Sequence, residues 1–207
     1  HEFGLQLEKR AHELHQRIQE QAGGVFNLNS PKQLGEVLFE RLKLMEKPKK
    51  TATGQYQTNE QVLQSLAGLH PIIGEILEYR EVTKLKSTYV DALPESVSKV
   101  DGRVHTTFHQ LMAATGRMAS SNPNLQNIPI RSDSGKEIRK AFVPGMDGWV
   151  LLSADYSQVE LRVMAALSDD PAMIEAFQQG QDIHQATAAK VYGVPLDGVL
   201  PEMRRTA

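Results

Sequence analysis

The sequence lacks cysteine altogether, and other features that would define a class of protein are scarce. Without cysteine, disulfide bonds and thiolate metal sites are excluded, so a reducing compartment is expected. No apolar run approaches the roughly 20 residues that a membrane-spanning helix needs, and no signal-peptide pattern is found, so we expect no membrane association. The formal net charge is only −2, so any nucleic-acid binding must depend on local patches.

What is present is typical of a globular protein. The chain has 207 residues, of which 40% are hydrophobic and 23% are charged. This composition excludes a disordered chain, and the length allows one large domain or two small ones. No internal repeat or low-complexity tract is found.

The first half of the sequence is predicted to be helical. Leucine and isoleucine recur at helical spacing from Leu5 onward, and Ser30 before Pro31 is a typical helix start. The predicted helices cover residues 5–21, 31–42, 59–69 and 71–93. Between them, residues 43–58 hold a basic cluster without periodicity, which predicts a mobile loop.

After Asp101 the pattern changes to strands mixed with helices. Alternating β-branched and aromatic residues predict a strand within 103–114, and a Gly-, Ser-, Asn- and Pro-rich stretch at 115–135 predicts irregular structure. Two short strands are expected at 138–145 and 148–155. Further helices are expected at 158–167, 168–177 and 182–193, with another beginning near 200. The predicted fold class is therefore α+β.

Asp155 in "SADYSQVELR" directly follows an apolar run and precedes a predicted helix. Strand ends beside helix starts often hold functional side chains, but such an aspartate can also simply cap the helix. Both interpretations stay open on these residues alone. One carboxylate rarely binds magnesium unaided, so a metal role requires a partner that this sequence does not obviously supply.

Several segments together resemble the family A DNA polymerases, the bacterial DNA polymerase I group. "DYSQVELRVMAALSDD" is similar to the first palm motif, and "EYREVTKLKSTYVDALP" to the long thumb helix. "GRVHTTFHQLMAATGRMASSNPNLQNIPIR" is similar to the palm segment under the primer terminus. "GQDIHQATAAKVYG" and "RRTA" are similar to the start of the fingers. These matches follow the family's order and cover nearly the whole chain from about Leu5.

The resemblance implies three regions: a thumb-like helical region at 1–95, a partial palm at 96–167 and the beginning of the fingers at 168–207. The implied architecture is an elongated helical thumb, a small antiparallel palm sheet containing Asp155, and the first helices of the fingers.

The resemblance also implies catalytic and metal-binding roles. Asp155 would be one of two aspartates that hold two Mg²⁺ ions, and the backbone carbonyl of Tyr156 would complete one metal's shell. Glu160 would be a catalytic residue that fills the space of a ribose 2′-hydroxyl and so selects deoxynucleotides. The alternative for Glu160 is an exposed helix residue paired with Arg162.

Two further residues, His184 and Arg204, are implied to bind the incoming nucleotide together with Glu160. They would contact the β- and γ-phosphates, where cations offset the charge on the departing pyrophosphate. Without the family resemblance, a histidine in the position of His184 would more often be an ordinary surface histidine.

Six residues are implied to bind DNA. Arg117 would read correct pairing through the minor-groove acceptors common to all base pairs, and Asn124, Gln126 and Arg131 would add nearby contacts. For Asn124 an Asx turn beside Pro123 is compatible with that role. Arg80 and Lys84 share a helix face and could meet phosphates, although a solvated face explains them equally well. The loop "KPKKTATG" could follow the duplex electrostatically or could simply be soluble.

The function implied is that of a DNA-directed DNA polymerase fragment, a nucleotidyltransferase whose partners are primer-template DNA and deoxynucleoside triphosphates in replication and repair. The second palm aspartate and the fingers lysine are expected beyond residue 207, so the isolated chain is predicted to be inactive. Alternatives are a primer-template binding module without catalysis and a piece that is stable only with its missing half. Self-association through exposed apolar surface is also expected, and so is a cytoplasmic, nucleoid-associated location in a bacterium.

Overall fold

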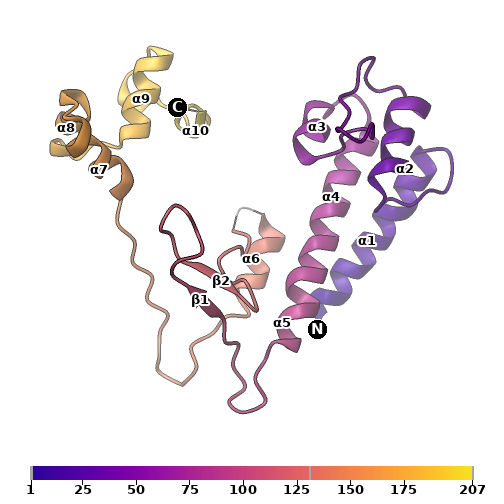
Figure 1. Ribbon diagram of the computed structural model, residues 1–207, viewed down its shortest axis with the longest axis horizontal. Helices are drawn as coiled ribbons and strands as arrows, with labels where there is room; N and C mark the ends of the chain where they lie inside the picture. The colour runs from indigo at the N-terminus through magenta and orange to yellow at the C-terminus, as the bar shows by residue number, and fades with distance from the viewer. Residues whose placement is uncertain (1, 131, 207) are drawn as a thin grey trace. The chain divides into compact units, whose positions relative to one another are not determined.

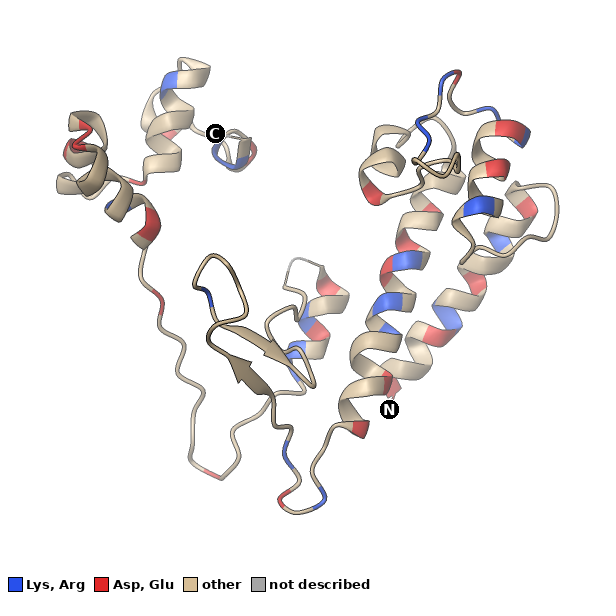
Figure 2. Ribbon diagram, viewed as in Figure 1, with Lys and Arg blue, Asp and Glu red and all other residues tan. Residues whose placement is uncertain are grey.

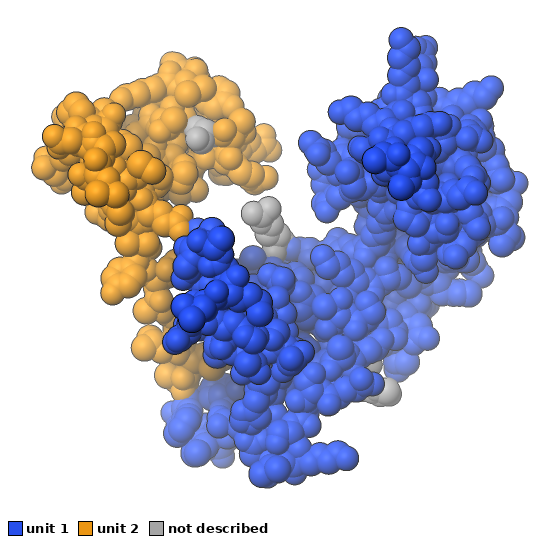
Figure 3. All heavy atoms as spheres, in the orientation of Figure 1, with its two compact units in different colours: residues 1–149 blue, residues 150–207 orange. Residues whose placement is uncertain are grey.

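The computed structural model describes residues 2–130 and 132–206, and the chain divides after Trp149 into two units (Figure 3). The first unit covers 1–149 and the second covers 150–207. This division into two differs from the three regions expected from the sequence, whose boundaries stay a prediction.

Two helices of the first unit, α1 (Glu2–Gln21) and α4 (Pro71–Leu85), lie side by side (Figure 1). Leu14 and Ile18 of α1 are completely buried, as are Ile72, Ile73 and Ile76 of α4. The apolar residues recur at the period of an α-helix, so each helix turns one stripe toward the other. Burial of these side chains stabilises the packing of α1 against α4.

Short helices pack around the ends of this pair. They are α2 (Pro31–Glu36), the π-helix η1 (Val37–Arg41), α3 (Glu60–Ser65), the π-helix η2 (Lys86–Asp91) and α5 (Ala92–Glu95). The predicted start at Ser30 is confirmed, because its side chain accepts a hydrogen bond from the backbone N–H of Gln33 and Pro31 follows. The helix predicted at 59–69 is shorter than expected and ends at Ser65.

A two-stranded antiparallel sheet follows, formed by β1 (Thr107–His109) and β2 (Ala119–Ser121). Phe108 pairs with Ser120 at its centre. The strand predicted within 103–114 is confirmed only in its middle three residues. β2 lies in the stretch 115–135 that was predicted to be irregular, so that prediction is wrong at this point.

The two strands predicted at 138–145 and 148–155 are wrong. Residues from Asp133 to Arg139 form helix α6 instead, and the Ser132 hydroxyl caps it by accepting a hydrogen bond from the Gly135 N–H at 3.2 Å. The segment 148–155 is extended but pairs with no strand in the described part of the chain. Asp155 therefore lies outside the sheet that was expected to contain it.

The second unit is helical. Its elements are α7 (Val159–Ser168), α8 (Pro171–Gln178), α9 (Ile183–Tyr192), the 3₁₀-helix η3 (Leu196–Gly198) and α10 (Pro201–Thr206). The predicted cap at Asp182 and the predicted end at Gly193, which has a φ of +65°, are both confirmed. Together with the small sheet, these helices confirm the α+β class. Among the described residues, no helix is both long and apolar enough to cross a bilayer.

Candidate functional site

Asp155 is exposed and lies four residues before the first residue of α7. The residue at the start of α7 is Gln158, whose backbone has the left-handed φ of +53° that is uncommon for a residue with a side chain. Asp155 is therefore not the cap of this helix, and that alternative is wrong. Tyr156, whose backbone carbonyl is the other proposed metal ligand, is also an exposed residue.

The start of α7 is fixed by polar contacts to the later helices. The side-chain oxygen of Gln158 accepts a hydrogen bond from the backbone N–H of Ile183 at 3.5 Å. Arg162 donates from Nε to the carbonyl of Ser157 at 3.0 Å, and its guanidinium lies 4.5 Å from the ring centroid of Phe177 in α8. These contacts hold the turn that follows Asp155, next to the exposed Glu160 in the first turn of α7.

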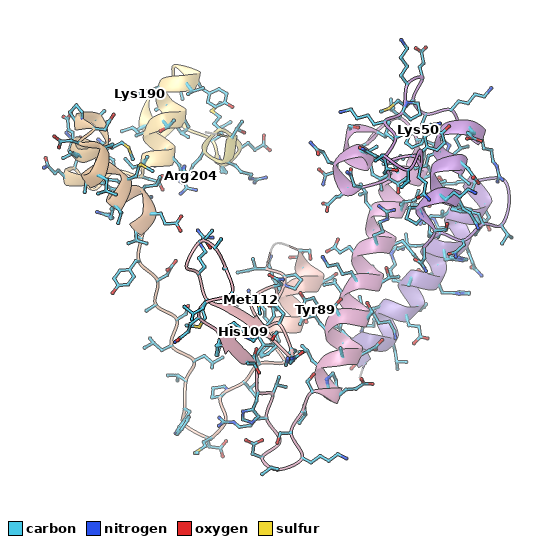
Figure 4. All side chains as sticks on the ribbon, viewed as in Figure 1. Lys50, Tyr89, His109, Met112, Lys190 and Arg204 are labelled. Carbon is cyan, nitrogen blue, oxygen red and sulfur yellow. The ribbon has the colours of Figure 1, made fainter. Side chains whose placement is uncertain are left out.

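His184 and Arg204 are brought to the same region by Asp182. His184 is exposed in the first turn of α9, directly after the capping residue. The Arg204 guanidinium donates to Oδ2 of Asp182 from Nε at 3.2 Å and from Nη2 at 2.6 Å. The hydrogen bond from Arg204 is the main reason that the pKa of Asp182 is lowered from its ordinary value. Figure 4 labels Arg204 on α10.

Asp182 is a site residue that the sequence did not reveal beyond its role as a helix cap. It lies 22 residues from Arg204. No local sequence signal connects an aspartate to an arginine at this separation, because the contact depends on the packing of α10 against α9.

The described residues supply only part of the ligand set expected for metal binding. No group of three or more histidine, aspartate or glutamate side chains is gathered for a cation among residues 2–130 and 132–206. Asp155 alone offers one exposed carboxylate, and a hard octahedral cation needs further oxygen ligands. The described residues therefore do not form a complete two-magnesium site.

The residues expected to bind DNA near the primer end lie around the β1–β2 loop. Arg117 is exposed in this loop. Gln126 accepts from the Ser120 N–H at 3.0 Å and donates to the Met118 carbonyl at 2.9 Å. The Asn124 carboxamide oxygen accepts from the Gln126 N–H at 3.0 Å, which confirms the Asx turn.

Asn124 and Gln126 thus fix the end of the loop that presents Arg117. Both polar atoms of the Gln126 side chain and the side-chain oxygen of Asn124 are used in these internal hydrogen bonds. Arg131, the fourth residue of this predicted group, lies outside the described residues.

Arg80 and Lys84 on α4 have different environments. Arg80 donates to the backbone carbonyl of Thr58 and lies 3.4 Å from its hydroxyl, and burial lowers the pKa of this guanidinium. Lys84 is exposed one turn later. Figure 2 shows that α1 and α4 both contain basic and acidic residues. Lys84 is thus the more exposed of the two side chains, whereas the Arg80 guanidinium is partly occupied by Thr58.

The basic loop at residues 43–58 is more ordered than predicted. Lys50 and Tyr56 form an antiparallel bridge, and the Lys50 ammonium lies 4.6 Å from the centroid of the Tyr56 ring. The Thr51 N–H donates to the Gln55 carbonyl at 2.7 Å and closes the turn. The exposed Lys47 and Lys49 lie just before this turn.

The first unit also contains a cavity of about 950 Å³ that the sequence did not reveal. Tyr89 at the end of η2 lines it and donates its hydroxyl to the Asn127 carbonyl (Figure 4). Other apolar residues in its wall include Phe3, Leu93, Leu125 and Phe142. The cavity lies where the helical pair meets the segments around the sheet.

Comparison with known proteins identifies the family of the chain. The family model described as DNA polymerase family A matches residues 1–207, so the chain belongs to this family. The DNA polymerase I of Chloroflexus aurantiacus is 51% identical over 209 residues, which cover 100% of this chain and 22% of that protein. The thermostable DNA polymerase I of Thermus thermophilus is 50% identical, covering 99% of this chain and 24% of that protein.

A solved structure has the same fold. It is the POL domain of Pol1 from M. smegmatis in complex with DNA primer-template and dNTP, with a TM-score of 0.88 and 45% identity. The match covers 99% of this chain and 36% of that one. The chain thus spans less than a quarter of the length of these two curated relatives and about a third of the solved domain.

Proposed function

We propose that this chain is part of a DNA-directed DNA polymerase of the DNA polymerase I type. The complete protein would extend a DNA primer on a template in replication and repair. The observation that best supports this proposal is the family match over residues 1–207, together with the similarity to a domain that was solved with primer-template and dNTP. A cytoplasmic, nucleoid-associated location in a bacterium follows from the same proposal.

The first unit would bind primer-template DNA. Arg117 would reach the minor groove from a loop whose end is fixed by Asn124 and Gln126, and Lys84 would contact a phosphate. Arg80 would support this surface by holding Thr58 rather than by touching DNA. The thumb, palm and fingers boundaries at 95 and 167 remain part of the proposal.

The second unit would bind the deoxynucleoside triphosphate. His184 and Arg204 would contact its phosphates, and Glu160 would exclude a ribose 2′-hydroxyl. Family A DNA polymerases use divalent metal ions, and we propose Mg²⁺ here, with Asp155 and the Tyr156 carbonyl as ligands. When bound, such ions activate the attacking hydroxyl and stabilise the phosphates. The missing ligands would come from parts of the polymerase other than the described residues.

The isolated 207-residue chain is proposed to be inactive, because one carboxylate cannot hold two cations. A primer-extension assay with Mg²⁺ and four deoxynucleotides tests this. Extension by the chain alone would contradict the proposed inactivity. Recovery of extension when a downstream fragment of the polymerase is added would support it.

The second candidate function is a duplex-binding module without chemistry. It is favoured by the exposed Lys47 and Lys49, which lie just before a defined turn. Binding of a primer-template by the isolated chain, weakening as salt rises, would support this candidate. Absence of binding at low salt would remove it.

Self-association of the isolated chain is proposed as well. Trp149, Val150, Leu151 and Leu152 form an apolar run with exposed fractions of 57%, 83%, 69% and 90%. An extended, uncharged, β-prone run of this kind readily pairs with another strand.

A further inference from the structure

We propose that Asp182 is a positioning residue that fixes the predicted phosphate contacts, His184 and Arg204, in one arrangement before a nucleotide binds. This inference rests on the proposed function. It concerns an aspartate that acts through an arginine and through the start of a helix, and that does not itself touch the substrate.

The two oxygens of the Asp182 carboxylate have separate tasks. Oδ1 accepts the backbone N–H of Gln185 at 3.0 Å and so caps α9, whose first turn contains His184. Oδ2 accepts Nε and Nη2 of Arg204 at 3.2 and 2.6 Å. One side chain therefore sets both the start of α9 and the direction of the arginine in α10.

The geometry leaves Arg204 able to bind an anion. Asp182 takes two of the guanidinium's five N–H groups, and the described residues take no further side-chain hydrogen bond from it. The side chain of Arg204 remains 48% exposed, whereas that of Asp182 is 27% exposed. The aspartate thus anchors one edge of the guanidinium, and the other edge is open to a phosphate.

The surrounding contacts hold the same arrangement. Gln185, whose backbone N–H is bound by Asp182, donates its side-chain amide to the Leu196 carbonyl at 2.7 Å. The backbone N–H of Arg204 donates to the Leu200 carbonyl at 3.1 Å. Helices α9 and α10 are therefore joined both through Asp182 and through the segment between them.

Anchoring matters because arginine has a long, flexible side chain. Ordering such a side chain on binding lowers affinity, and a residue that orders it beforehand removes that cost. The low pKa of Asp182 keeps the carboxylate charged throughout the neutral range, so the anchor is present when the polymerase works.

The test uses the polymerase that contains this sequence, a primer-template, Mg²⁺ and a single matching deoxynucleoside triphosphate. Single-turnover incorporation separates the nucleotide Kd from the maximal rate. In Asp182→Asn the side-chain oxygen still caps α9, but the amide cannot accept from Arg204. We expect the Kd to rise about 2- to 10-fold, with the maximal rate changed by less than about twofold.

Two controls show that the effect passes through Arg204. Asp170 caps α8 by accepting the Met173 N–H at 2.9 Å, and no ion pair involves it among the described residues. Asp170→Asn removes the same charge from the same kind of position and is expected to leave the Kd unchanged. In an Arg204→Gln background, Asp182→Asn is expected to add nothing further. A thermal midpoint within about 2 °C of the parent confirms that each variant is folded.

A Kd for Asp182→Asn that is unchanged or lower than in the parent overturns the inference. The inference is also overturned if Asp182→Asn raises the Kd by the same factor in the Arg204→Gln background, since the aspartate would then act independently of the arginine. If the parent protein incorporates no nucleotide, the proposed function itself fails, and the inference fails with it. If the parent incorporates the nucleotide and Asp182→Asn has the same nucleotide Kd, only the inference fails and the proposed function stands.

Discussion

Arg80 and Lys84 lie one turn apart on α4, and their replacement by alanine should have opposite consequences. Thr58 is only 6% exposed, and its backbone carbonyl accepts a hydrogen bond from Arg80. Arg80→Ala leaves this buried carbonyl without its donor, which costs about 1–3 kcal/mol of unfolding free energy. For a chain of this size that lowers the thermal midpoint by roughly 2–12 °C. Lys84→Ala removes an exposed charge, so its effect on stability should stay within about 0.5 kcal/mol.

The DNA-binding effects of the two changes should be reversed. Each lysine–phosphate contact contributes about 0.9 to the slope of log K against log salt for duplex DNA. Lys84→Ala should therefore reduce this slope by about one, whereas Arg80→Ala should leave it unchanged. Calorimetry gives the midpoints, and fluorescence anisotropy of a labelled primer-template at several salt concentrations gives the slopes. An Arg80→Ala variant with an unchanged midpoint and a reduced slope would refute this reasoning.

Three further results are expected. Leu14 is fully buried between α1 and α4, so Leu14→Ala should lower the unfolding free energy by about 2–5 kcal/mol in urea titrations, and an unchanged midpoint would contradict this packing. The pKa of Asp182 is lower in the folded protein, so its ionised carboxylate stabilises the fold above the unfolded value near 3.9, and this stabilisation is lost as pH falls through the folded value. Thermal scans between about pH 2 and 5 should therefore show a smaller pH dependence of the midpoint for Asp182→Asn than for the parent. Leu151→Lys should reduce self-association of the isolated chain in sedimentation experiments, and an already monomeric parent would rule that association out.

The helices could be predicted because their signals are local. Ser30, Asn59, Asp170 and Asp182 each accept a hydrogen bond from the backbone three residues later, so a single short stretch of sequence specifies the helix start. The helical spacing of leucine and isoleucine predicted the helix that is α1, and Leu14 and Ile18 of this pattern are fully buried.

Strands could not be predicted in the same way, because a strand depends on a partner far away in sequence. The run from Trp149 to Leu152 has the composition of a buried strand, yet it is exposed and unpaired within the described residues. Conversely, residues 138–145 have β-prone side chains, but the Ser132 cap and the hydrogen bonds of α6 determine the structure of their first part. Short polar strands such as β2 give no apolar alternation to detect.

The candidate site shows the same limit. The resemblance predicts site roles for Asp155, Glu160, His184 and Arg204. It does not predict which side chains surround them, because these neighbours depend on contacts between helices. The Arg204–Asp182 ion pair, the Arg162–Phe177 contact and the Arg80–Thr58 hydrogen bond all join residues at least 15 positions apart. Pairing over such separations is set by packing, which a single sequence does not reveal.

We propose that Asp155 supplies a metal-binding carboxylate of a DNA polymerase. Asp155→Ala in the complete polymerase tests it by primer extension with Mg²⁺, and Asp147→Ala, another exposed aspartate before α7, is the matched control. Because metal ions contribute several kcal/mol to the stabilisation of the reacting phosphate, extension should fall by about a thousandfold or more in Asp155→Ala and stay unchanged in Asp147→Ala. Undiminished synthesis by a folded Asp155→Ala polymerase would contradict the claim.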